Sequence, residues 1–132
     1  MPQYNPPIRD MQFVLHELLD VETQLAELPP YAEYGPDLFD QVLEEGGRFC
    51  AEVLFPLNRS GDEEGCRHEG DGVVRTPAGF KDAWDKFREA GWPTLTCDPE
   101  YGGQGLPYAV GMAFQEMLNS ANQAWTMYPG LS

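Results

Sequence analysis

Apolar residues recur at helical spacing in four stretches of the chain. The first stretch predicts a short amphipathic helix over about residues 9–20. Its apolar positions are Met11, Val14, Leu15, Leu18 and Leu19. In the second stretch, one apolar face with a period of about 3.6 residues predicts a long helix over 36–55. Pro56 lacks a backbone donor and clashes with the preceding turn, so we expect it to end or kink this helix.

The segment 58–75 has no helical period and mixes glycines with charges of both signs. It therefore predicts an exposed loop, with one short strand at Val73-Val74. A third helix is expected over 77–90, where Thr76 supplies an N-cap and Pro77 occupies the first helical position.

Turn-forming residues fill 92–107, after which alternating small and large apolar residues predict a fourth helix from Val110 to Trp125. Pro129-Gly130 closes that helix. Because no strand pattern is long enough for a sheet, the expected fold is all-α, a small antiparallel helical bundle.

Composition narrows the class of protein. A chain of 132 residues with 42% apolar residues fits one compact domain with a single core. Its net charge of −14 disfavours nucleic acid as a partner. Three widely spaced cysteines indicate no disulfide framework, and neither a membrane span nor a secretory signal is recognisable. These features predict a cytoplasmic protein.

No pattern in the sequence specifies chemistry by itself. Gly102-Gly103-Gln104-Gly105 precedes a helix, but it lacks the spacing of a dinucleotide fingerprint or P-loop, so turn conformations are favoured over a phosphate site. The acids of 62–71 do not match the calcium loop of an EF-hand. Cys66 and His68 are too few ligands for zinc. We therefore predict no metal site and no catalytic residue in the chain.

The segment 90–106 carries a specific resemblance. Ala90-Gly91-Trp92-Pro93-Thr94-Leu95, followed by Asp98-Pro99-Glu100-Tyr101-Gly102-Gly103-Gln104-Gly105-Leu106, resembles the acyl-CoA dehydrogenase pattern P-E-x-Y-G-G-x-G-L, with one residue fewer before Tyr101 than the common P-E-E-Y form. The next helix carries Glu116 in its middle, as in that family. The opening 4–17 is similar to the N-terminal extension of a bacterial subgroup of larger members. This resemblance implies an extension over 1–35 and a helical N-terminal domain over 36–132.

The resemblance implies a flavoenzyme of fatty acid metabolism with three parts, of which the middle β-domain and the C-terminal helical domain lie outside this sequence. The family removes a proton α to the thioester carbonyl and passes the β-hydride to FAD, which leaves a trans-2-enoyl-CoA. We expect the parent to bind FAD and acyl-CoA and to form a homo-oligomer. The fragment alone is expected to hold no cofactor and to be inactive.

The resemblance also implies one wall of the acyl pocket at the end of the fourth helix. That segment corresponds to Trp125, Thr126, Tyr128 and Pro129. Core packing of a helix end is the alternative for the same residues. For the whole chain, a stand-alone helical interaction module without catalysis is the alternative to an enzyme domain, and a calcium- or metal-binding regulatory domain is the weakest of the three.

Overall fold

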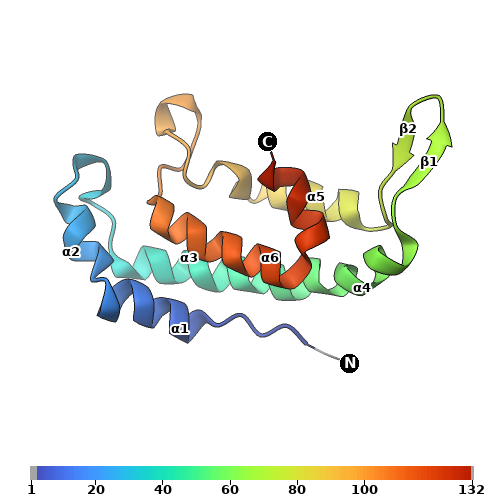
Figure 1. The fold of residues 1–132 in the computed structure, drawn as a ribbon. Helices are drawn as coiled ribbons and strands as arrows, with labels where there is room; N and C mark the ends of the chain where they lie inside the picture. Colours follow the sequence, from blue (N-terminus) through green and yellow to red (C-terminus); the bar gives the residue numbers. More distant parts are fainter. Residues whose placement is uncertain (1–2, 132) are drawn as a thin grey trace.

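The structure is a computed structural model and describes residues 3–131. One long helix forms its axis (Figure 1). It consists of α3 (Pro36–Phe49), the π-helical turn η3 (Cys50–Leu54) and α4 (Phe55–Glu64). The long-helix prediction is confirmed at its N-terminal end, where Pro36 occupies the first helical position.

The long helix does not end at Pro56, and this part of the prediction was wrong. In η3 the amide of Phe55 donates to the carbonyl of Cys50, five residues back. Pro56 then lies in the first turn of α4, where its missing N–H costs little. The helix therefore runs on to Glu64, and the non-helical segment begins at Gly65.

The N-terminal extension is helical and lies beside the long helix (Figure 1). It comprises α1 (Ile8–Gln12), the π-helical segment η1 (Phe13–Leu18), α2 (Val21–Ala26) and the short 3₁₀ turn η2 (Pro29–Tyr31). The first two occupy the helix predicted over 9–20, whereas α2 was not predicted.

Two strands replace part of the predicted loop. β1 (Arg67–Gly70) pairs antiparallel with β2 (Val73–Arg75), with an irregularity between His68 and Gly70. The expectation of a single short strand and no sheet was therefore wrong. The turn is formed by Asp71 and Gly72, whose φ angles of 51° and 77° suit a tight hairpin connection.

Helices α5 and α6 complete the described fold. α5 (Phe80–Glu89) begins later than predicted, and Gly79 rather than Thr76 precedes it. The turns η4 (Trp92–Thr94) and η5 (Pro99–Tyr101) then lead to α6 (Tyr108–Gly130), which is kinked at Asn122.

Residues 3–131 are predominantly helical, as predicted, but the simple antiparallel bundle is not confirmed. In Figure 1, α1 and α5 run opposite to the long helix, whereas the first part of α6 runs in the same direction. α6 packs along α3, η3 and α4. α3 and α6 approach each other closely at Gly46, where a Cβ would lie only 2.6 Å from Phe114 Cδ2. The absence of a side chain at Gly46 therefore makes room for the Phe114 ring. The largest fully buried apolar side chains are Trp125, Phe39, Leu43, Leu54, Met117 and Val110.

In the described part of the chain, no helix combines the length and the apolar character that crossing a membrane requires.

Candidate functional site

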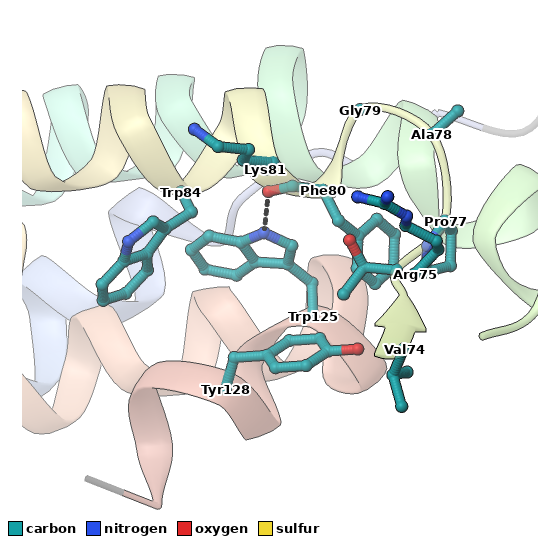
Figure 2. Close-up of a pocket in the computed structure, with 11 residues that line it drawn as sticks. Val74, Arg75, Pro77, Ala78, Gly79, Phe80, Lys81, Trp84, Trp125 and Tyr128 are labelled. Atoms are coloured by element: carbon teal, nitrogen blue, oxygen red, sulfur yellow. Dashed lines mark hydrogen bonds between the residues drawn. The ribbon is translucent and has the colours of Figure 1, made fainter. Parts of the chain in front are cut away.

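A cavity of about 670 Å³ opens beside the last part of α6 (Figure 2). Its walls come from the end of β2, the connector that follows it, the start of α5 and the end of α6. The lining residues are Val74, Arg75, Thr76, Pro77, Ala78, Gly79, Phe80, Lys81, Trp84, Trp125 and Tyr128. This volume falls within the range of about 300–1,000 Å³ that is usual for small-molecule sites.

The kink at Asn122 brings the end of α6 to this cavity. Asn122 is only 1% exposed, and its φ and ψ of −162° and 86° interrupt the helix. Its side-chain oxygen accepts from the amide of Trp125 at 3.0 Å, which is the hydrogen bond of a helix N-cap. Its side-chain nitrogen donates to the carbonyl of Leu54 at 3.1 Å. Asn122 thus starts a second helical segment and ties it to η3.

Trp125 lies at the boundary between core and cavity. Its side chain is 1% exposed, and its ring meets that of Phe87 edge-on at a centroid distance of 5.2 Å. Its Nε1 donates to the carbonyl oxygen of Phe80 at 3.1 Å, the dashed line in Figure 2. The ring contact with Phe87 and the hydrogen bond to Phe80 therefore fix the side chain of Trp125 in position. Trp125 also belongs to the lining of the cavity.

Tyr128 lies at the outer side of the same cavity and is 48% exposed. Its ring stands at 86° to that of Phe80, with centroids 6.1 Å apart. Its hydroxyl shares a hydrogen bond of 3.4 Å with the thiol of Cys66, at the base of the hairpin. This hydrogen bond and partial burial raise the pKa of Tyr128, so the phenol is neutral at ordinary pH.

The other two predicted pocket residues lie elsewhere. Thr126 is buried, and its hydroxyl donates to the carbonyl of Asn122 at 2.9 Å, so it supports the kink and does not line the cavity. Pro129 lines a neighbouring cavity of about 660 Å³ on another side of the same helix end. The structure thus brings together Trp125 and Tyr128 of the four predicted residues.

Two cationic side chains line the cavity, and both already have partners. Arg75 is paired with Glu69 at 3.0 Å and Lys81 with Asp85 at 2.6 Å. No carboxylate, imidazole or thiol belongs to the lining set of this described cavity. The cavity can therefore hold and orient an apolar group and exclude water from it, but it offers no carboxylate base to accept a proton.

The glycine-rich turn before α6 does not form a phosphate cradle. Gly102 and Gly105 have φ angles of 85° and 68°, as expected for turn glycines. The amides of Gly102, Gly103, Gln104 and Gly105 all donate to carbonyls within the same loop, those of Pro99, Asp98, Thr94 and Cys97. Because these donors are used internally, the turn does not fit the pyrophosphate of FAD, and we assign it no flavin contact. Among the described residues, no cluster of three or more metal-ligating side chains is present.

Sequence reasoning missed two features that shape the site. Asn122 was treated as part of a continuous helix, although asparagine in the interior of a helix and three residues before Trp125 is a possible N-cap. The hairpin was missed as well, although Asp71-Gly72 is a strong signal for its tight turn.

Comparison with known proteins agrees with the motif in 90–106. Residues 40–132 match the family model described as "Acyl-CoA dehydrogenase, N-terminal domain". The chain is 42% identical over 129 residues to a 3-methylmercaptopropionyl-CoA dehydrogenase of Ruegeria pomeroyi, covering 98% of this chain and 22% of that protein. It is 30% identical over 122 residues to a butyryl-CoA dehydrogenase of Syntrophomonas wolfei, covering 90% of this chain and 20% of that protein.

The chain thus spans about a fifth of the length of these curated relatives. The family match covers most of the chain, including the glycine-rich turn and all of α6 up to its end. From this match and the motif together, the chain belongs to the acyl-CoA dehydrogenase family, in which it corresponds to the N-terminal domain.

Proposed function

We propose that this chain is the N-terminal domain of a flavin-dependent enzyme that oxidises acyl-CoA thioesters to trans-2-enoyl-CoA, and that it supplies one wall of the acyl pocket. Family membership supports the reaction class. The observation that carries the role of the domain is the cavity beside Trp125 and Tyr128, where the family resemblance implies the acyl wall.

In this proposal the domain binds the acyl group and shapes its pocket. The proton and hydride transfers take place on groups in the rest of the parent enzyme. The cavity has no carboxylate in its lining. The four backbone amides of 102–105 already donate to carbonyls of their own loop and do not bind a phosphate. FAD would accept the hydride in the parent, held by parts of the protein outside residues 1–132. The residues of this chain would exclude water and fix the position of the acyl group.

Trp125 and Tyr128 are the wall residues that the geometry favours. The buried ring of Trp125 gives a rigid apolar surface, and the more exposed Tyr128 can limit the length of the space. Each methylene that such a wall buries contributes about 0.8 kcal/mol. Thr126 would affect the acyl wall indirectly, by supporting the kink at Asn122. Pro129 would contribute only to the neighbouring cavity that it lines. The relatives are named for a 3-methylmercaptopropionyl and a butyryl group, so we propose a short acyl chain as substrate.

The test is made on the full-length parent and on residues 1–132 alone. We expect the parent to purify yellow and its flavin absorbance to bleach when a short acyl-CoA is added without oxygen. The isolated chain should be colourless and inert towards the same thioesters with an artificial electron acceptor. A parent that binds no flavin and oxidises no acyl-CoA would favour the alternative, a helical interaction module.

We propose the domain division, the location and the assembly of the parent as well. Residues 1–35 form an extension to the domain at 36–132, which agrees with a family match that begins at residue 40. The protein works in the cytoplasm, and it assembles as a homo-oligomer together with its β-domain and C-terminal domain.

A further inference from the structure

The imidazole of His16 is held between two carboxylates from different helices. On one side its Nδ1 contacts Oε1 of Glu22, from α2. On the other its Nε2 lies 2.7 Å from Oδ1 of Asp40, from α3. His16 itself belongs to η1, so the three side chains, here called the His16 cluster, join three separate elements.

This geometry favours one protonation state. A neutral imidazole has one N–H donor and one bare nitrogen, so one carboxylate would face a lone pair. Only the imidazolium form donates to both carboxylates at once. Partial burial lowers the pKa of His16, but the hydrogen bonds to Asp40 and Glu22 and their charges outweigh that effect, so the pKa lies above its ordinary value.

Among residues 3–131, no third charged side chain forms a hydrogen bond or an ion pair with the ring. The charged groups that face it are Glu22 on α2 and Asp40 on α3, and on its own element Glu17 is paired with Arg9 at 2.6 Å. Within residues 3–131, no lysine or arginine forms an ion pair with Glu22 or Asp40. The proton on His16 is therefore the only positive charge between these two acids in the described ion pairs.

The cluster is the charged link between the extension and the domain. The extension also docks through apolar residues, since Met11, Leu15 and Val21 are buried in the core, and through a hydrogen bond from the hydroxyl of Tyr34 to the carbonyl of Gln104. The family match starts at residue 40, so Asp40 lies at its first position while His16 and Glu22 precede it. A second groove, of about 590 Å³, lies between the extension, which lines it with residues of α1 and η1, and α6.

We propose that the His16 cluster is a proton-dependent clasp that fastens the N-terminal extension to α3 and loosens as the pH rises. Below the ordinary histidine pKa of about 6.5, both the docked and the open extension carry the proton, and the clasp contributes its full stabilisation. The stabilisation falls as the pH rises through the higher pKa of the docked state. Above that pKa the extension opens more often and exposes its buried apolar face.

The test combines two measurements on residues 1–132. An NMR titration of the His16 ring nitrogens should give a midpoint above about 6.5, with His68 assigned separately through His68→Gln. Amide hydrogen exchange in 8–26, corrected for intrinsic rates, should report more opening above the midpoint than below it, because the clasp loses its stabilisation as His16 gives up its proton. Both measurements are independent of flavin and of acyl-CoA.

The variants distinguish a clasp from a passive contact. Asp40→Asn should lower the His16 midpoint and weaken the pH dependence of exchange in the extension, and His16→Gln should abolish that pH dependence. Asp37→Asn, an exposed change on the same helix outside the cluster, should leave both unchanged. A His16 midpoint at or below the ordinary value, or an undiminished pH dependence in His16→Gln, would overturn the proposal.

Discussion

Asn122 shows how one buried polar side chain can set the course of a helix. Its side-chain amide accepts from the N–H of Trp125, in the segment that follows the kink, and donates to the carbonyl of Leu54 in η3. Its own carbonyl accepts from Thr126. Because buried polar groups are costly when unpaired, the kink is stable only with a side chain that both donates and accepts.

We expect Asn122→Ala to lower the free energy of unfolding by about 1–3 kcal/mol, because it removes the buried hydrogen bonds to Trp125 and Leu54. Urea denaturation followed by tryptophan fluorescence measures this change. The matched control is Asn119→Ala, one turn earlier and exposed, which loses only a hydrogen bond to the carbonyl of Gln115. Equal losses in the two variants would count against the role of Asn122.

The three cysteines should react differently with thiol reagents. Burial raises the pKa of the Cys50 thiol to about 12, whereas Cys66 and Cys97 are exposed. Because the thiolate is the reactive form, we expect two thiols to react quickly with a disulfide reagent at pH 8 and the third only after unfolding in urea. The variant Cys50→Ser should retain the full fast phase; a smaller fast phase would show that Cys50 is accessible.

At the level of elements, the sequence predicted well where periodicity was the decisive signal. The apolar stripes located α3, α5 and α6, because burying one face is what stabilises a helix of that length. The prediction from sequence failed where hydrogen bonds override the apolar periodicity or the usual effect of proline. The π-turn before Pro56 lets the helix continue, and Asn122 breaks a helix whose apolar pattern is unbroken. Neither effect is visible in the spacing of apolar residues.

The candidate site was only partly predictable for a related reason. The family resemblance implied a pocket wall at the end of the fourth helix, but the opposite wall of the cavity comes from 74–81 and Trp84, far away in the sequence. Such a wall depends on how the hairpin returns the chain to α5. Trp125 and Tyr128 were therefore predicted as neighbours along a helix, while their partners Phe80 and Trp84 were not.

The hairpin turn gives a test at this scale. Asp71 has a positive φ, which asparagine tolerates and alanine tolerates poorly. We expect Asp71→Ala to speed amide exchange in 67–75 relative to Asp71→Asn, with a cost of about 1 kcal/mol. Unchanged exchange in the alanine variant would mean that the tertiary contacts of the hairpin, and not its turn, hold it in place.

At the scale of the whole molecule, the domain has apolar surface without a partner in this structure. Tyr108 and Met112, on the first part of α6, are 71% and 50% exposed. Apolar patches of this kind usually mark contact surfaces. The relative from Ruegeria pomeroyi is nearly five times as long as this chain, and we propose that other domains of the same protein cover this face.

The isolated chain should consequently self-associate. We expect sedimentation velocity to show a mass that rises with concentration, and Met112→Lys to shift the distribution towards the monomer. Gln41→Lys, an exposed polar position on α3, adds the same charge on a different helix and should have a smaller effect. A monomer at every concentration would contradict the interpretation of α6 as an interface.

The central claim is that Trp125 and Tyr128 form a wall of the acyl pocket, and the most direct measurement is a chain-length series of kcat/KM in the full-length parent. Tyr128→Ala and Trp125→Ala should each shift the preference towards longer chains, by up to about fourfold per added methylene, because each buried methylene contributes about 0.8 kcal/mol. Thr126→Ser, which keeps the hydroxyl of a residue outside the cavity, should preserve the parental profile. If both alanine variants keep the parental chain-length profile and lose only stability, the two aromatic residues are core residues and the claim fails.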